Sequence, residues 1–556
     1  EDVKDVKKGV AAVKVQVLAK EDTDMDGVYF SIELPASYAG KGSIKMDEGD
    51  AQSLHGNLAG LTDKPVSTVS FTAPQQRLTL HFATPVALLL RNETDRNGSH
   101  LQLYIPLHQG KLGKGTTVER ELTIAASGVI DNAPVLLRID TAQTGRMFKG
   151  FGGNFRLQNA RTDPQVIDYC LDNLRVAWSR VEMPWRFWQP QKGDHPVDSA
   201  RSGKLDPRVK KAMEMAQRLS KKGIPVILSA WSAPSWAIEG APRSSPGPDG
   251  VWGNPLNTGN MQEIYQSITG YISYLKEAYG VEVSLFSFNE SDLGINVRQT
   301  GEEHAALIKG LGAYMAQHGL KTKMLLGDNS DANSIDFIRP AMEDSATHPY
   351  IGAISFHSWR GWEKPLLEKW AAAASRLKRP LIVGEGSIDA QAWGYPAIFE
   401  EPRYAREEIN LYVRLLNICQ PLAILQWQLT SDYSPLAGGG IFGNHAPLHP
   451  TQRFWNLKQL GDTPEGLKAM AASADKADIS IAALGNNKTH TYAIHMVNNG
   501  PSRKAVIKGL PGEVSKLRVF VTDSKRNMEE LAPIPVRDGT ASFLLTYGAY
   551  ITLRSR

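Results

Sequence analysis

Leu285-Phe286-Ser287-Phe288-Asn289-Glu290 is a short apolar segment that ends in two polar residues. Apolar runs of this length are typical of strands that are buried on both faces, as in a parallel sheet. A second segment, Leu381-Ile382-Val383-Gly384-Glu385, has the same form and also ends in a glutamate. The two glutamates lie 95 residues apart, which corresponds to three strand–helix units of about 32 residues each. We therefore place them at the ends of a fourth and a seventh parallel strand.

Six further apolar runs complete a series of eight, and helical patterns separate most of them. The other strand candidates are Phe148–Phe155, Val176–Val181, Pro225–Ala230, Met324–Gly327, Ala353–Phe356 and Ala423–Gln426. The clearest helical patterns are Arg208–Lys221, Gln262–Tyr279, His304–His318 and Pro365–Arg376. Eight such units in series predict a closed (β/α)₈ barrel, or TIM barrel, of the α/β class. A doubly wound open sheet is the alternative, and the lack of a dinucleotide fingerprint disfavours it.

The regions on either side of this barrel have the short alternating runs of β-domains. Before about residue 140 these runs are Val13–Val17, Val28–Ile32, Leu78–Phe82 and Leu101–Ile105. After residue 460 they are Thr489–Met496, Lys516–Val521 and Ala541–Leu553. We predict a β-sandwich-like domain at 1–140, the barrel at 141–460 and a C-terminal β-sandwich at 461–556. The first domain contains no tryptophan, so we expect a structural or oligomerising role rather than carbohydrate binding.

The composition excludes several classes of protein. Sixty-two Lys+Arg against 58 Asp+Glu give a net charge of +4 with no basic block, so we expect no nucleic-acid partner. No apolar run approaches the roughly 20 residues of a membrane span, and two cysteines cannot form a disulfide framework. The chain begins with Glu1 instead of methionine, and we expect an exported protein, periplasmic or extracellular, whose signal peptide has been removed. The sequence makes no prediction of the oligomeric state.

No cofactor or metal motif stands out. Gly438-Gly439-Gly440-Ile441-Phe442-Gly443 matches G-x-G-x-x-G formally, but it follows the last strand instead of sitting at a strand–helix turn. Gly150–Phe155 lacks the third glycine of that pattern. The 13 histidines show no ligand spacing. We therefore interpret the first stretch as a flexible loop and expect neither a cofactor nor a metal.

The carboxyl ends of the strands in a closed barrel meet at one shared mouth. The residues at these ends are Asn154, Arg180, Trp231, Asn289, Glu290, Asp328, His357, Glu385 and Trp427. Two carboxyl groups on either side of a sugar ring are what glycoside hydrolysis requires. A structural ion pair with Arg180 is the alternative role for either glutamate.

Ordered motifs from about Asp140 to Arg556 resemble the clan A retaining glycoside hydrolases, most closely family 30. They are Lys149-Gly150-Phe151-Gly152-Gly153, Ser179-Arg180-Val181-Glu182-Met183, Ser229-Ala230-Trp231-Ser232-Ala233-Pro234-Ser235-Trp236, Asn289-Glu290, His357, Glu385-Gly386, Trp427 and Arg453-Phe454-Trp455-Asn456-Leu457. The resemblance implies that Glu290 is the general acid/base and Glu385 the nucleophile. It also implies a retaining mechanism with the two carboxyl groups about 5–5.5 Å apart.

The same resemblance implies a set of substrate-binding residues. Asn289 would bind the sugar 2-hydroxyl, and Trp231, Trp236, Trp359 and Trp427 would stack on sugar faces, with Arg180 and His357 at the same mouth. The chemistry requires Glu290 to be protonated and Glu385 ionised; we expect Arg180 to keep Glu385 charged and an apolar wall to favour the neutral form of Glu290.

Three departures from the family pattern carry information. Ser291 replaces the proline that commonly follows the acid/base. Trp359 stands where the family has a tyrosine that contacts the nucleophile, so an indole N–H must replace the phenol or the contact is absent. Pro184-Trp185-Arg186 replaces an aspartate that grips glucose hydroxyls in glucosidase-type members. Arg186, together with Arg298 and Arg360, is a candidate for binding a substrate carboxylate such as that of a uronic acid; a surface or ion-pairing role for these arginines is the favoured alternative.

These features together predict a retaining glycoside hydrolase that acts on a β-linked or stereochemically equivalent glycan, with a carbohydrate as its only substrate partner. A glycan-binding protein on an inactive barrel is one alternative, which the retention of both glutamates disfavours. A transglycosylase is another, because it shares every catalytic residue and differs only in how well it excludes water.

Overall fold

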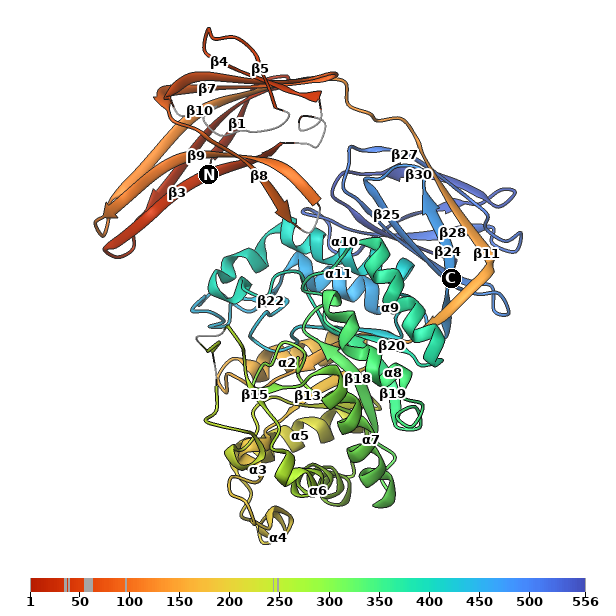
Figure 1. Cartoon of the computed structure of the whole chain (residues 1–556). Helices are drawn as coiled ribbons and strands as arrows, with labels where there is room; N and C mark the ends of the chain where they lie inside the picture. Colours follow the sequence, from red (N-terminus) through yellow and green to blue (C-terminus); the bar gives the residue numbers. More distant parts are fainter. Residues whose placement is uncertain are drawn as a thin grey trace. The chain divides into compact units, whose positions relative to one another are not determined.

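The computed structural model describes residues 2–34, 38, 41–54, 64–95, 98–243, 245–247 and 250–555. Contacts divide the chain into two compact units, Glu1–Asp131 and Asn132–Arg556. Figure 1 shows the two units in the colours of the sequence. Each unit has hydrophobic clusters of its own.

The second unit contains a closed barrel of eight parallel strands. In barrel order these are β12 (Gly150–Phe155), β13 (Ser179–Met183), β14 (Val226–Ala230), β16 (Val283–Phe288), β18 (Lys323–Asn329), β19 (Ile351–Phe356), β20 (Leu381–Gly386) and β21 (Ala423–Gln426). The pairing of Gly150 with Ala423 closes the ring between the first and last strands. Every strand coincides with a run predicted from the sequence, so the prediction of a (β/α)₈ barrel is confirmed and the open sheet is excluded.

The barrel strands fill their own interior. Ile227, Leu285, Leu325, Ala353, Ile382 and Leu425 form a separate buried cluster supplied by six of the eight strands. A larger apolar cluster lies between the strands and the surrounding helices. The strands therefore have two buried faces, which explains why they read as continuous apolar runs in the sequence.

Helices follow most of the strands and cover the barrel (Figure 1). The main ones are α2 (Asp163–Asn173), α5 (Pro207–Lys221), α6 (Met261–Tyr279), α7 (Gly301–Gln317), α9 (Lys364–Leu377), α10 (Pro402–Ile418) and α11 (Gln452–Gly461). Local signals set their ends: Thr300 and Glu303 form a capping box at the start of α7, and Gly280 ends α6 in the left-handed conformation. The four helices predicted from the sequence are all present.

A nine-stranded sheet completes the second unit as a sandwich-like domain. Strand β11 (Val135–Phe148) of this sheet comes from before the barrel. The strand order is β29 (Glu529–Pro535), β28 (Lys516–Thr522), β31 (Tyr550–Arg554), β26 (Thr491–Asn498), β25 (Ile479–Asn486), β24 (Leu467–Ala474), β11, β27 (Arg503–Lys508) and β30 (Thr540–Leu545). Strand β11 pairs antiparallel with β24 and parallel with β27. Residues 135–140, which the sequence boundary placed in the first domain, therefore lie in this sheet. The predicted run Ala541–Leu553 consists of two strands, β30 (Thr540–Leu545) and β31.

The first unit is built from two antiparallel sheets. One has the order β1 (Asp2–Lys7), β2 (Val10–Leu18), β10 (Thr117–Gly128), β7 (Gln76–Val86), β6 (Val66–Ala73), β4 (Ser43–Met46) and β5 (Gln52–Ser53). The other has the order β3 (Thr23–Leu34), β9 (Gly98–Leu112) and β8 (Leu89–Asp95). Side chains of both sheets, such as Val15 of β2 (Val10–Leu18) and Leu103 of β9 (Gly98–Leu112), share one buried cluster. Among the described residues of the whole chain, no helix has the length and apolar character needed to cross a membrane. Both cysteines, Cys170 and Cys419, are buried and unpaired.

Candidate active site

Arg180 is the centre of a polar network at the carboxyl ends of the barrel strands. Its guanidinium is completely buried and donates to Oε1 of Glu385 at 2.8 Å and to Oδ2 of Asp328 at 2.8 Å. It also donates to Oδ1 of Asn289 at 2.5 Å and to Oδ1 of Asn154 at 3.0 Å. Arg180 is the second residue of β13, and its guanidinium thereby joins side chains in or just after four other strands, β12, β16, β18 and β20.

Asp328 and His357 are two completely buried members of this network. Oδ2 of Asp328 accepts from Arg180 and from the hydroxyl of Ser287, while its Oδ1 lies 3.1 Å from Nε2 of His357. Burial opposes ionisation of Asp328, but the charge of Arg180 and the hydrogen bonds from His357 and Ser287 overcome it and hold its pKa well below the usual range. Asp328 was visible as a strand end, but its role was not predicted.

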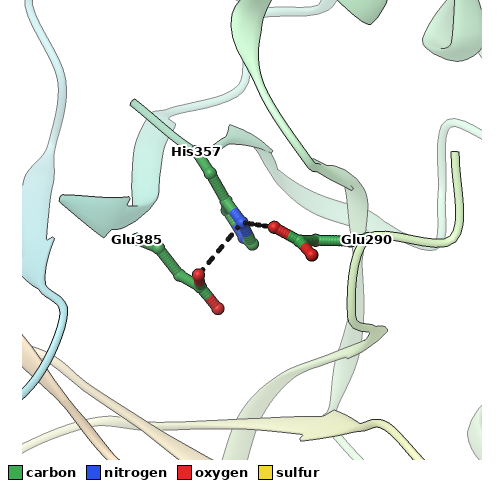
Figure 2. Close-up of side chains that lie close together, drawn as sticks. All are labelled: Glu290, His357 and Glu385. Carbon is green, nitrogen blue, oxygen red and sulfur yellow. Dashed lines mark hydrogen bonds and ion pairs between the residues drawn. The ribbon is translucent and has the colours of Figure 1, made fainter. Parts of the chain in front are cut away.

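His357 lies between the two candidate catalytic glutamates (Figure 2). Its Nδ1 is 2.9 Å from Oε1 of Glu290 and 3.3 Å from Oε2 of Glu385. Burial lowers the pKa of the imidazole, but the carboxylates of Glu385, Asp328 and Glu290 outweigh this and raise it to about 10. At neutral pH His357 is therefore a cation that donates through both nitrogens.

The two glutamates differ in exposure. The Glu385 side chain is 4% exposed, and that of Glu290 is 13% exposed. Burial raises the pKa of Glu385, and the charges of His357 and Arg180 oppose this rise. The expected contact from Arg180 is thus present, but burial sets the direction of the pKa. Against the carboxyl of Glu290 the structure places the imidazole of His357, where we expected an apolar wall.

A cavity of about 530 Å³ lies above these carboxyl groups. Aromatic side chains form much of its wall, and they include Trp231, Trp359, Trp427 and Tyr433. The rings of Trp231 and Trp427 meet edge to face, with centroids 5.9 Å apart. Asn289, Glu290 and Glu385 line the same cavity. The arrangement offers flat apolar surfaces beside a carboxyl pair, which is the surface that a sugar ring needs.

Trp359 contacts the nucleophile candidate directly. Its indole N–H donates to Oε2 of Glu385 at 3.3 Å. Of the two possibilities that the sequence left open at this position, the structure has the one in which an indole N–H replaces the phenol. Trp359 is therefore placed to orient the carboxylate as well as to line the cavity.

Two residues of the predicted site lie away from this cavity. The indole N–H of Trp236 donates to the backbone carbonyl of Gln189, and its ring packs edge to face against Trp185. Arg186, in α3 (Trp185–Trp188), is exposed and lies over the ring of Phe187. Neither lines the cavity: Arg186 lies in the short helix after β13, and Trp236 lies in the short helix η1 (Ser235–Ala237) after β14.

The other two arginines grouped with Arg186 are also absent from the lining of the cavity. Arg298 lies in the short strand β17 (Val297–Arg298). Arg360 is exposed and pairs with Asp331 at 3.2 Å. The cation that does line the cavity is Arg156, which follows β12, pairs with Glu182 at 2.8 Å and lies over the ring of Trp231 at 4.4 Å.

Sequence reasoning missed several residues of the cavity wall, which lie in loops or, for Trp393, in the short helix η4 (Ala392–Gly394). They include Arg156, Gln158, Trp393, Asp432, Tyr433 and Phe442. Burial raises the pKa of Asp432 to about 6, although the nearby charge of Arg156 acts against it. Loop residues carry no periodicity, so only their position just after β12, β20 and β21 offered a signal.

Three side chains of the site could together hold a metal ion. A ring nitrogen of His357 and one carboxylate oxygen each of Glu290 and Glu385 lie within 4.8 Å of one another. A metal ligand must be a neutral imidazole, whereas the pKa of His357 near 10 keeps it protonated. The donor set therefore suits proton transfer better than metal binding. The expectation that no metal takes part stays a prediction.

The fold and these strand-end residues invite comparison with known proteins. No protein-family model and no curated protein sequence matches the chain. Solved structures do match: a family 30 glycoside hydrolase endoxylanase from Clostridium papyrosolvens superposes with a TM-score of 0.59 at 17% identity, over 76% of this chain and 99% of that one. A family 30 subfamily 8 xylanase from Clostridium acetobutylicum gives 0.60 at 15% identity, over 75% and 98%.

An endo-β-1,6-glucanase is similar as well, with a TM-score of 0.51 at 15% identity over 77% of this chain and 95% of that one. At these identities the likeness concerns the fold. The second unit has the clan A glycoside hydrolase fold in the form found in family 30, a barrel with a β-domain attached. This confirms the resemblance that the sequence motifs indicated.

Proposed function

We propose that this protein is a retaining glycoside hydrolase, with Glu290 as general acid/base and Glu385 as nucleophile. One observation carries the proposal: the two carboxyl groups stand at the ends of β16 and β20, on either side of His357, in a cavity walled by aromatic rings. A barrel of this fold hosts many chemistries, so the pair and its setting matter more than the fold.

The spacing of the carboxyl groups favours retention. Ligand-type oxygens of Glu290 and Glu385 lie within 4.8 Å of each other. Retaining enzymes place their carboxyl groups about 5–5.5 Å apart, whereas inverting enzymes leave about 6.5–9.5 Å for a water molecule. In the retaining reaction Glu290 protonates the departing oxygen while Glu385 forms a bond to the anomeric carbon. A water molecule then attacks the anomeric carbon while it gives a proton to Glu290, and the carboxylate of Glu385 leaves.

The charged side chains around the carboxyl pair are compatible with these proton transfers. Arg180 and His357 carry two positive charges, and Asp328, Glu290 and Glu385 can carry three negative ones. A net buried charge is costly, so the cluster is most stable when one carboxyl group holds a proton. The 2.9 Å contact between His357 and Glu290 gives that proton a path between imidazole and carboxyl.

The substrate is a glycan, and the neighbours support a β-linked polysaccharide, since two of them are xylanases and one is an endo-β-1,6-glucanase. The test is sugar release from a panel of polysaccharides and aryl glycosides by wild type, Glu290→Gln and Glu385→Gln. Glu277→Gln serves as control, because Glu277 is exposed and pairs with Arg201 at the surface. Release by wild type and the control alone supports the proposal.

Azide then separates the two roles. With an activated aryl glycoside, Glu290→Ala plus azide should give the glycosyl azide of retained configuration, because the covalent intermediate still forms. Glu385→Ala plus azide should give the inverted azide, because azide replaces the nucleophile. No release by wild type, together with a glycan that raises its melting temperature, would favour the glycan-binding alternative. Transfer to added sugar acceptors in place of hydrolysis would favour the transglycosylase.

A further inference from the structure

A second cavity, of about 430 Å³, lies beside the first, and the glycine-rich loop forms one of its walls. The loop, Gly438–Gly443, connects β22 (Leu436–Ala437) to β23 (His449–Pro450). We call this space the loop cavity; its other wall is η5 (Pro396–Glu400) with the preceding Tyr395. The sequence pattern that resembled a nucleotide fingerprint therefore has another role in this fold.

The glycines of the loop are required by its shape. Gly438, Gly439, Gly440 and Gly443 all have positive φ, and a Cβ on Gly438 would lie 2.3 Å from the carbonyl oxygen of Pro447. Backbone hydrogen bonds fix the turn, including Gly440 N–H to the carbonyl of Asn444 at 2.7 Å. Phe442 is held at the tip with φ of 45°, a conformation that costs energy for a bulky residue.

The side chain of Phe442 lines both cavities. A row of aromatic contacts leads from it to the carboxyl pair: Phe442 lies 6.1 Å from Phe399 between ring centroids, and Phe399 lies 4.9 Å from Tyr433. Tyr433 in turn lies 5.7 Å from Trp359, whose indole contacts Glu385. The loop cavity thus adjoins the candidate active site, and Phe442 lines both.

Three large aromatic side chains are exposed around the two cavities: Trp393 lines the first cavity, Tyr395 lines the loop cavity, and Phe442 lines both. Trp393 is 57% exposed, and Tyr395 and Phe442 are each 48% exposed. Exposed apolar side chains that cluster in one region of a protein surface are typical of a binding site. Flat, half-exposed rings at the edge of a polar cavity are suited to the apolar face of a sugar ring.

The charged residue that lines the loop cavity favours an uncharged sugar over an acidic one. Glu400 is the charged residue among its described lining residues, and none of these is a lysine or arginine. The amide of Asn444 donates to Glu400 at 3.3 Å, and His449 lies 3.9 Å from it. A uronic acid would meet a carboxylate here with no arginine fork to bind it. Neutral hydroxyls, by contrast, find an acceptor in Glu400.

We propose that the loop cavity is a subsite for a neutral sugar unit of the same glycan chain whose scissile bond lies at Glu290 and Glu385, with Tyr395 and Phe442 as its platforms. This inference rests on the proposed function and deepens it. The substrate is then an extended chain of neutral sugars, and chain length beyond the first cavity contributes to its recognition.

The experiment compares two substrates of one linkage: the aryl glycoside of a single sugar, and the six-unit oligosaccharide of the polysaccharide that wild type cleaves in the panel. The readout is the ratio of kcat/KM for the longer substrate to that for the shorter. In Tyr395→Ala we expect this ratio to fall about tenfold, as loss of one stacking ring implies. Ala397→Trp, which fills the cavity with an indole, should lower it as well.

Two controls isolate the ring. Tyr395→Phe loses the hydrogen bond to Asp389 but keeps the platform, and it should keep the wild-type ratio. Tyr547→Ala removes an exposed tyrosine of the C-terminal domain, and its ratio should also match wild type.

If wild type cleaves the glycan but the ratio is unchanged in Tyr395→Ala and Ala397→Trp, the subsite is overturned while the hydrolase stands. If wild type cleaves nothing, both proposals fail. A change in molecular mass for Tyr395→Ala would instead assign the rings to contact between copies, against the subsite.

Discussion

Nδ1 of His357 lies 2.9 Å from Oε1 of Glu290. A residue that follows the sixth barrel strand is thus in hydrogen-bond contact with a carboxyl group that follows the fourth. The same imidazole reaches Asp328 through its other nitrogen. His357 therefore connects the proposed acid/base to the buried anion at the floor of the site. In the reaction that we propose, His357 would hold a proton beside the acid/base carboxyl group.

The raised pKa of His357 makes a pH-dependent contribution to stability. The folded pKa is about 10 against 6.5 for a free imidazole, so this contribution is complete below pH 6.5 and is lost as the pH rises toward 10. Between pH 6 and pH 10 we expect wild type to lose on the order of 4 kcal/mol more unfolding free energy than His357→Gln. Urea unfolding at both pH values measures the difference, and parallel pH profiles of the two proteins would contradict it.

Trp359 offers a test of a single donor atom. Trp359→Phe removes the N–H that contacts Glu385, and hydrogen bonds to a charged group contribute about 1.5–3 kcal/mol. We expect kcat/KM to fall about tenfold or more. Trp359→Tyr restores a donor and should keep more activity than Trp359→Phe at equal melting temperature. Equal activity of the two variants would mean that the contact has no part in catalysis.

Asp432 should weaken the fold above pH 6. Burial raises its pKa from 3.8 to about 6, so the folded state holds a proton that the unfolded state has released between these values. The contribution of Asp432 to stability is therefore most favourable below pH 4 and is lost as the pH rises through 6. Asp432→Asn should be more stable than wild type by about 1–3 kcal/mol at pH 8 and equal to it at pH 4. The free energy of unfolding at the two pH values checks this, and a difference that is the same at both would refute it.

Arg186 separates the sequence-based expectation from the structural one. If Arg186 bound a substrate carboxylate, the variant Arg186→Met would act far more weakly on an acidic substrate. Because Arg186 is exposed over Phe187 and does not line the cavity, we now expect its kcat/KM to stay within about twofold of wild type, the range of ordinary surface substitutions. Arg156→Met, which changes the cation of the cavity wall, is the comparison. A loss confined to acidic substrates in Arg186→Met would restore the earlier expectation.

Much of the fold was readable from local pattern. Strands such as Val283–Phe288 and Leu381–Gly386 are buried on both faces, and this leaves apolar runs that need no knowledge of their neighbours. The amphipathic repeat of helices such as Met261–Tyr279 is equally local. Strand β11 escaped this logic, because its place beside β24 and β27 depends on pairing with residues more than 300 positions away.

By itself the sequence determined the eight-strand order, and with it the positions of Glu290 and Glu385 at strand ends that face one mouth. Only the tertiary structure decided which side chains complete the site. It turned Trp236 toward Trp185, placed Trp359 on Glu385, and brought loop residues such as Asp432 to the wall. The physical reason is that strand periodicity fixes direction within an element, whereas the direction of a loop side chain depends on what packs against it.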